Sequence, residues 1–411
     1  MTHRRRAWAV FAVMAAMFCL SQFYRMSVAL IAVDLETDLG LDPGRLSLLV
    51  GAFFYAFAAV QLPLGTALDR WGAKRVVVAA TLTAAAGSLL FGLSPGWTGL
   101  LLGRVLMGLG MAPVLMGSFK LIAEWFPATA FGRLSGLILA VGTLGSLLAA
   151  TPLAWLVGWL GWRGTFVGFG ALTLASTAAI HRIVRDRPRG SPAGGPGAYG
   201  PLQGLGRVLG TRSFWAMVPL CLTGYATLVC IQGLWAGPYF MDALGYSRVE
   251  AGNILLGLGL FTAAGSVAAG LFSDRVVRSR KWVIVGGNVL GIVFLLPLAG
   301  VARPQGPWGW AFVLSAFGFF SATRSLLYAH VKESVPPELV GTAVTAVNLF
   351  VMLGPALFQQ AMGLVLTLRP GDYAAAFLVP IAGLAVGIAA YLFTRDTHPT
   401  RPQGDALDLV T

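Results

Sequence analysis

The chain is a series of long apolar runs separated by short stretches that carry charge, glycine or proline. Most runs hold about twenty or more residues, the length that an α-helix needs to cross the hydrocarbon core of a bilayer. Because hydrocarbon solvates neither charges nor unpaired backbone groups, each run predicts a transmembrane helix and each polar stretch a connection outside the lipid. The predicted spans lie near residues 8–33, 46–68, 74–94, 98–122, 133–156, 163–183, 213–238, 250–272, 282–301, 307–329, 340–364 and 373–394.

These spans form two groups of six, separated by a stretch rich in arginine, proline and glycine. Such a stretch has little to bury and is typical of a flexible linker. The predicted fold class is therefore an all-α membrane protein with twelve transmembrane helices in two six-helix pseudo-repeats. The predicted parts are an N-terminal half over 1–184, a cytoplasmic linker over 185–212, a C-terminal half over 213–396 and a cytoplasmic tail over 397–411.

Two short patterns occur in both halves, about two hundred residues apart. The charged turn Gly65–Arg75 returns in part as Gly270–Arg275, and Glu124-Trp-Phe-Pro127 returns as Glu333-Ser-Val-Pro336. In each copy of the second pattern, a charged residue and a proline end one span. The repetition predicts a duplication in which two six-span halves are related as parallel repeats.

Composition agrees with a polytopic membrane protein and excludes an ordinary soluble domain. Hydrophobic residues make up 57% and charged residues 11% of the chain, against about 25% charged residues in soluble domains. The net charge of +13 would suggest nucleic acid in a soluble chain, but here the cations lie at span ends. The three cysteines lie inside apolar runs, and no His/Cys/Asp cluster is visible, so we expect no disulfide, metal or cofactor.

The distribution of lysine and arginine predicts the orientation. Basic residues are concentrated at alternate connections, and the positive-inside rule places these in the cytoplasm together with both termini. The opposite connections hold only Arg45, Arg163, Arg248, Arg303 and Arg369. We therefore expect a multi-pass protein of a bacterial inner membrane whose basic loops contact anionic lipid rather than nucleic acid.

Arg25 is the most informative single residue, because it lies roughly seventeen residues into the first span. A charge at that depth costs several kcal/mol unless it faces water or a counter-ion, and every Asp and Glu falls in a loop, a tail or a span end. Arg324 and Lys120 are weaker candidates of the same kind, since Lys120 could pair with Glu124 or reach the membrane edge. Embedded cations without embedded carboxylates favour an anionic substrate, which a guanidinium can bind through two hydrogen bonds.

Further polar and aromatic positions could line a substrate cavity, although an aromatic stripe is also typical of packing. Tyr225, Gln232, Trp235 and Tyr239 would share one helical face in the seventh span. The predicted substrate-binding set is Arg25, Gln22, Tyr24, Tyr55, Lys120, Tyr225, Gln232, Trp235, Arg324 and Asn348.

The turn at Gly65–Arg75 resembles the signature loop between spans two and three of major facilitator superfamily transporters. In addition, Arg104-Val-Leu-Met-Gly108-Leu-Gly110 resembles the family's Arg-x-x-x-Gly-x-Gly signature in span four, where the arginine could be structural or proton-linked. Arg25, which follows a tyrosine, resembles the span-one arginine of organophosphate/phosphate exchangers and organic-anion symporters. The resemblance implies a gating role for Gly65, Asp69, Arg70, Gly72, Lys74, Arg75, Arg104, Asp274 and Arg275.

Together these features predict a secondary transporter that moves a small organic anion by alternating access, as an exchanger or a proton-linked symporter. The resemblance implies a monomer, and we expect no catalytic residues. One alternative is a proton-coupled efflux pump for drugs or other small solutes, although the Gly-Pro pair of the antiporter branch is absent from the fifth span. Another is a transporter-like component of a membrane compartment.

Overall fold

The protein is almost entirely helical in the computed structural model, which describes residues 3–186, 201–336 and 339–397. Within these ranges no strand occurs. The linker residues 187–200 and the tail from 398 onward lie outside the described residues. The helices of the first half are α1 His3–Met26, α2 Ala32–Leu39, α3 Pro43–Ala59, α4 Gln61–Trp71, α5 Ala73–Leu93, α6 Trp97–Met111, α7 Pro113–Trp125, α8 Ala128–Leu148 and α9 Thr151–Ile183.

The remaining helices follow the predicted linker, whose described part contains a short helix. They are α10 Pro201–Leu209, α11 Arg212–Cys230, α12 Ala236–Pro238, α13 Arg248–Leu271, α14 Arg280–Leu295, α15 Gly306–Ser321, α16 Leu326–Glu333, α17 Val340–Leu368 and α18 Tyr373–Tyr391. Four short non-α segments join them: the π-helices η1 Ile231–Trp235, η2 Tyr239–Ala243 and η3 Phe272–Val277, and the 3₁₀ helix η4 Ala322–Ser325.

The apolar helices match the predicted order of spans. In the described part of the chain, nine helical stretches are long and apolar enough to cross a membrane, or ten if the α3–α4 pair, bent by 45°, counts as one span. The apolar α8 occupies the place of the fifth span, and α14, with 16 residues, occupies that of the ninth. The chain is therefore a multi-pass membrane protein.

Several spans are interrupted where hydropathy predicts continuity. The first helix ends at Met26, and a turn precedes α2, although the apolar run continues to residue 33. The fifth span ends at Leu148, and α9 begins at Thr151 and kinks at Gly161, where φ is +66°. Hydropathy reports only how apolar a residue is, so it does not detect such breaks.

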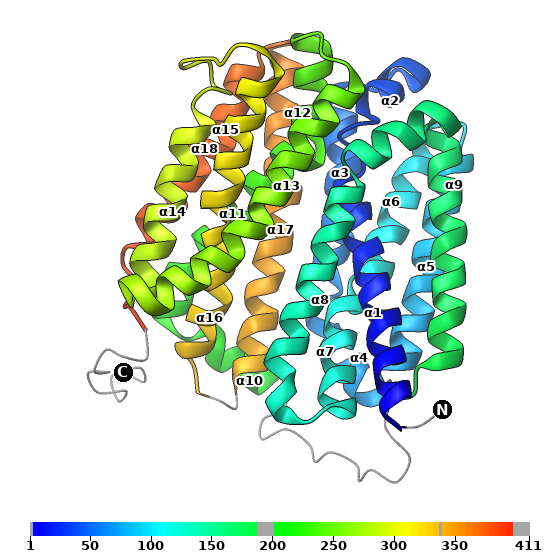
Figure 1. Cartoon of the computed structure of the whole chain (residues 1–411), viewed down its shortest axis with the longest axis vertical. Coiled ribbons are helices and arrows are strands. Elements are labelled where there is room, and N and C mark those ends of the chain that lie inside the picture. The colour runs from blue at the N-terminus through cyan, green and yellow to red at the C-terminus, as the bar shows by residue number, and fades with distance from the viewer. Residues whose placement is uncertain (1–2, 187–200, 337–338, 398–411) are drawn as a thin grey trace. The chain divides into compact units, whose positions relative to one another are not determined.

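The helices form two packing units. Unit 1 comprises residues 1–195 and Gly233–Gly252, and unit 2 comprises Pro196–Gln232 and 253–411. In unit 1, α5 packs against α6 and α9, and α1 packs against α8 and α7 (Figure 1). The α5–α6 contact depends on glycine, because a Cβ added to Gly87 would lie 2.7 Å from the carbonyl oxygen of Gly103.

In unit 2, α11 packs against α17 and α18, and α14 packs against α15 and α18. Close contact again depends on glycine. A Cβ on Gly354 of α17 would lie 1.9 Å from the carbonyl oxygen of Leu222 in α11. Such approaches are typical of membrane helices, which gain stability from packing rather than from burial of apolar surface away from water.

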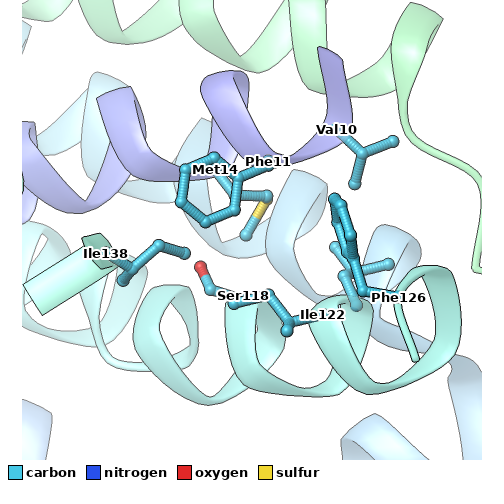
Figure 2. Close-up of a pocket in the computed structure, with 8 residues that line it drawn as sticks. Val10, Phe11, Met14, Ser118, Ile122, Phe126 and Ile138 are labelled. Carbon is cyan, nitrogen blue, oxygen red and sulfur yellow. The ribbon is translucent and has the colours of Figure 1, made fainter. Parts of the chain in front are cut away.

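A small pocket in unit 1 lies between α1, α7 and α8 and is apolar. Figure 2 shows its lining, which includes Val10, Met14, Phe126 and Ile138. The Ser118 hydroxyl in this lining donates to the carbonyl oxygen of Val114 at 2.7 Å, so its proton is already used. The pocket offers no charged group to a polar ligand.

Candidate functional site: a buried arginine beside a helix break

Arg25 lies in the last turn of α1, immediately before the helix ends at Met26. Its side chain is only 5% exposed, and its guanidinium carbon lies 4.5 Å from the centre of the Phe57 ring of α3. The Nε atom is buried without a hydrogen-bond partner, and within the described residues no salt bridge involves Arg25. The position at a helix C-terminus favours a cation, but the donors of the guanidinium remain available.

Other polar atoms near Arg25 along the same helix are also unused. Ser21 lies one turn earlier on the same face, and its hydroxyl oxygen and the Oε1 atom of Gln22 are buried without partners. Tyr55, two residues before Phe57 on α3, is half-buried. Trp235, which belongs to unit 1, has a buried indole N–H without a partner. Among the described residues, unit 1 thus contains a buried cation together with buried polar atoms without a partner on Ser21, Gln22 and Trp235.

Arg104 and Tyr24 hold this part of the first span in place. The Arg104 Nη1 atom donates to the carbonyl oxygen of Tyr24 at 2.7 Å, and its Nε atom donates to that of Leu49 at 3.3 Å. The carbonyls of a helix's last turn have no partner within the helix, so Arg104 satisfies one of them directly beside Arg25. The Tyr24 hydroxyl makes a hydrogen bond of 2.9 Å with Thr173 of α9, so it is used for packing in this structure.

The glycines that follow Arg104 explain the spacing of the signature. A Cβ on Gly108 would lie 2.3 Å from the carbonyl oxygen of Phe53 in α3, and one on Gly110 would lie 2.4 Å from that of Ala80 in α5. The two glycines therefore let α6 contact two neighbouring helices at once. This is the packing function expected of glycine at such positions.

Arg324 is a partly buried cation of unit 2, and it also lies at a helix break. It belongs to η4, and its Nη1 atom donates to the carbonyl oxygen and the hydroxyl of Ser321 at 3.0 and 3.2 Å. Its guanidinium carbon lies 5.9 Å from the centre of the Tyr225 ring, whose hydroxyl is buried without a partner. One turn further on, the Tyr328 hydroxyl donates to Oδ1 of Asn348 at 3.0 Å.

The predicted face of the seventh span is changed by the π-helix η1. The α-helix ends at Cys230, so the α-helical spacing that would align Tyr225 with Trp235 does not continue through Ile231–Trp235. Gln232 belongs to unit 2 and Trp235 to unit 1. In unit 2, Gln359 donates to the carbonyl oxygen of Val229 at 3.0 Å, and its Oε1 atom is buried without a partner.

Lys120 is placed beside the turn between α4 and α5. Its ammonium donates to the carbonyl oxygen of Leu68 at 2.8 Å, so the structure brings it to the predicted gating turn and not to Arg25.

In this turn Gly72 ends α4 with φ +82° and ψ +153°, and α5 begins one residue later. The backbone N–H of Lys74 donates to the Asp186 carboxylate at 2.7 Å, and a Cβ on Gly72 would meet that carboxylate at 2.7 Å. Arg70 and Arg75 are exposed, Gly65 has open space around it, and the side chain of Asp69 lies outside the described residues.

In the second copy of the turn, a carboxylate again caps the start of the following helix by accepting a backbone hydrogen bond. This second turn is one residue longer. Asp274 forms an ion pair with Arg280, and Arg280 also pairs with Glu333 at 3.2 Å, while Arg275 is exposed. The Asp396 carboxylate accepts from the backbone N–H of Arg280 at 3.0 Å, as Asp186 does from that of Lys74. Sequence reasoning missed both caps, although each carboxylate belongs to an Arg-Asp pair at the end of its six-span half, Arg185-Asp186 and Arg395-Asp396.

Comparisons with known proteins agree with this architecture. The family model described as Major Facilitator Superfamily matches residues 12–359 and 231–408. The chain is 24% identical to a protein named as a probable sulfoacetate transporter of Cupriavidus necator, over 93% of each chain. It is also 24% identical to a protein named as a probable galactarate/D-glucarate transporter of Bacillus subtilis, over 90% of this chain and 87% of that one.

Solved structures show the same fold. A bacterial homologue of the human lysosomal transporter Spinster, in an inward-facing and unoccupied conformation, matches with a TM-score of 0.75 and 18% identity, over 94% of this chain and 95% of that one. A D-xylose–proton symporter matches with a TM-score of 0.74 and 17% identity, over 95% and 98%. From the family model and these likenesses together, the chain belongs to the major facilitator superfamily of membrane transporters.

Proposed function

We propose that this protein is a secondary transporter that moves a small organic anion by alternating access, and that Arg25 binds the anionic group. The observation that carries the proposal is that Arg25 is only 5% exposed and has no carboxylate partner among the residues that the structure describes. Leaving such a charge uncompensated costs several kcal/mol. A carboxylate or sulfonate that enters the protein would offset that cost and accept hydrogen bonds from the planar guanidinium.

Two further observations support an anionic substrate. The helices α1, α3, α5, α6, α9, α11, α14, α15, α17 and α18 contain no Asp or Glu, so a bound cation would find few counter-charges there. The relatives named above are described as transporters of sulfoacetate and of galactarate or D-glucarate, which are organic acids. We infer that this chain takes substrates of the same broad class.

The remaining parts of the proposal follow from charge. We place the basic ends of the helices and both termini in the cytoplasm of a bacterial cell, because lysine and arginine are retained on that side. The whole protein functions as a monomer. A coupling proton is carried by the substrate or is not transported, since the helices named above contain no carboxylate that could carry it.

The test is uptake by purified protein in liposomes, using radiolabelled sulfoacetate, D-glucarate, galactarate and galactonate, with galactose as a neutral probe. We expect uptake of at least one acid and not of galactose. Arg25→Gln should raise the KM at least tenfold, and Arg25→Lys should fall between it and wild type because an ammonium lacks the planar pair of donors.

Arg45→Gln is the matched control, because Arg45 is about half exposed and pairs with Asp42, three residues away, at 3.6 Å. The KM of Arg324→Gln, measured in the same way, tests the partly buried cation of unit 2. Uptake that is equal for neutral probes, or that is unchanged in Arg25→Gln, would contradict an anionic site at Arg25. Acidifying the outer solution at fixed membrane voltage separates proton symport, which it accelerates, from exchange.

A further inference from the structure

The short helix α2 has one carboxylate attached to the body of unit 1 and another attached to a segment from later in the chain. Asp38 accepts hydrogen bonds of 2.9 Å from both Trp162 and Arg163 of α9. Asp34, one turn earlier, accepts from Nη2 of Arg248 at 2.6 Å, and both of these side chains are 26% exposed. α2 is thus fixed on one side and holds Arg248 on the other.

Arg248 belongs to the segment Gly233–Gly252, which packs in unit 1 although the helical residues on both sides of it pack in unit 2. Two glycines of the segment lie close to unit 1. A Cβ on Gly237 would lie 1.8 Å from the carbonyl oxygen of Ala29, and one on Gly252 would lie 3.1 Å from the Cα atom of Thr151. These glycine approaches are van der Waals contacts, whereas the Asp34–Arg248 bond is a directional, charged contact.

The chain has a place to bend where this segment begins. The π-helix Ile231–Trp235 contains Gly233 and covers the point at which the chain passes from unit 2 to unit 1. π-helical turns are often found at functional sites and at kinks in helices. The segment can therefore leave α2 without unfolding the preceding helix α11.

We propose that the Asp34–Arg248 ion pair is a latch that holds the segment Gly233–Gly252 on α2 and opens once in each transport cycle. The inference rests on the proposed function, because a transporter that alternates between two states must release contacts that exist in only one of them. A partly exposed ion pair suits this task, since water can solvate both charges when the pair opens.

The first test measures how often the segment leaves unit 1 and needs no substrate. In a chain whose Cys19, Cys221 and Cys230 are replaced by serine, Thr151→Cys places a thiol under Gly252, and its labelling rate by a maleimide reports release of the segment. We expect Asp34→Asn and Arg248→Gln to raise this rate at least fivefold. The double exchange Asp34→Arg with Arg248→Asp should return it toward the starting value.

Asp42→Asn is the matched control, because Asp42 pairs with Arg45 three residues away and contacts no part of the segment in the described structure. It should leave the labelling rate unchanged. Equal rates in the parent, Asp34→Asn and Arg248→Gln would overturn the latch, as would an increase in Asp42→Asn of the same size.

The second test asks whether transport requires opening. Joining Asp34→Cys with Arg248→Cys by a bifunctional methanethiosulfonate, whose spacer replaces the length of the arginine side chain, should stop uptake of the organic acid that the wild type carries, and reduction should restore it. The same reagent on Asp42→Cys with Arg45→Cys bridges neighbours within one helix end and should leave uptake intact. Unchanged uptake after complete cross-linking of residues 34 and 248 would reject the latch. Absence of uptake in the wild type would instead contradict the proposed function, and the labelling rates would then decide the latch.

Discussion

Arg104 is a buried cation that holds the backbone beside a second buried cation, Arg25. Its guanidinium binds the carbonyl oxygens of Tyr24 and Leu49, and it is fully buried. We expect Arg104→Gln to destabilise the protein, because it removes two buried hydrogen bonds from a charged donor, each contributing about 1.5–3 kcal/mol. Arg104→Lys should lose less, since an ammonium can still reach one carbonyl.

The measurement is thermal unfolding in detergent together with uptake kinetics. A positioning function predicts that Arg104→Lys raises the KM for the acid while Arg45→Gln leaves both the melting temperature and the KM unchanged. A melting temperature for Arg104→Gln equal to that of the wild type would show that these two hydrogen bonds contribute nothing.

Glu36 gives a prediction for pH. It lies on α2, where burial, and then the neighbouring Asp242 carboxylate, raise the pKa of Glu36 to about 7 from its ordinary value of 4.5. A carboxyl group whose pKa is raised in the folded state favours folding while it is protonated, and this contribution is lost as the pH rises through the folded pKa. The melting temperature of the wild type should therefore fall relative to that of Glu36→Gln between about pH 4.5 and pH 7.

Both variants are melted at each pH so that all other titrating groups cancel in the difference. Asp38→Asn is the contrasting variant, because the Trp162 indole and then Arg163 hold the pKa of Asp38 below its ordinary value. A difference between wild type and Glu36→Gln that stays constant from pH 4 to pH 8 would show that Glu36 titrates normally.

Burial of Arg25 could be predicted from its distance into the apolar run, but the helix break beside it could not. The residues from Ser27 to Val33 are nearly all apolar and contain neither proline nor glycine, so nothing in the local pattern marks an end at Met26. The break is stabilised by Arg104, which is about eighty residues away in sequence, and pattern analysis of a single span does not see such a partner. The roles assigned to Arg25 and the other substrate-binding residues stay predictions.

At the scale of elements, the turn between spans two and three and the turn between spans eight and nine reverse the chain through a positive φ at different residues. Gly72 carries the turn in the first copy with φ +82°, and Arg278 carries it in the second with φ +50°. The second turn follows the π-helix Phe272–Val277, which accommodates one additional residue. This explains why the repeat in sequence loses its match after Arg275.

We expect Gly72→Ala to be clearly destabilising, because this backbone conformation costs a non-glycine residue about 1–3 kcal/mol and the new Cβ would meet the Asp186 carboxylate. Arg278→Gly should have a small stabilising effect, since relief of about 1–2 kcal/mol of left-handed strain is partly offset by the entropy of glycine, about 0.5–1 kcal/mol. Thermal unfolding of the two variants checks both signs, with Gly136→Ala as the control because a Cβ there meets nothing within 4 Å. Equal effects at positions 72 and 136 would contradict the importance of this turn.

At the scale of the whole molecule, the resemblance to the major facilitator superfamily and the helical fold were predicted from the sequence, and both are confirmed. The prediction succeeded because the Gly65–Arg75 turn and the apolar runs are local patterns. The division of the seventh span between two packing units was missed, because it depends on which surface each part of the span contacts.

The Arg-Asp pairs at the end of each half give a prediction at this scale. Asp186 caps the helix that begins at Ala73, and Asp396 caps the one that begins at Arg280. Replacing either with Ala should lower stability by about 0.5–2 kcal/mol, the usual value of a cap. The double variant should show the sum, because the two residues share no partner in the described structure. Unfolding of the two single variants and the double variant tests this, and strong non-additivity would contradict independent caps.

The assignment of Gly233–Gly252 to unit 1 has a consequence for biosynthesis. When the ribosome has synthesised the first six spans, it has not yet synthesised the segment Gly233–Gly252, which packs on Ala29, Asp34 and Thr151. Domains usually complete folding in the order in which they are synthesised, but we expect the first half of this protein to complete its packing only after residue 252 has been synthesised. A nascent chain stalled before that point should therefore be more sensitive to proteases at α2 than one stalled after it.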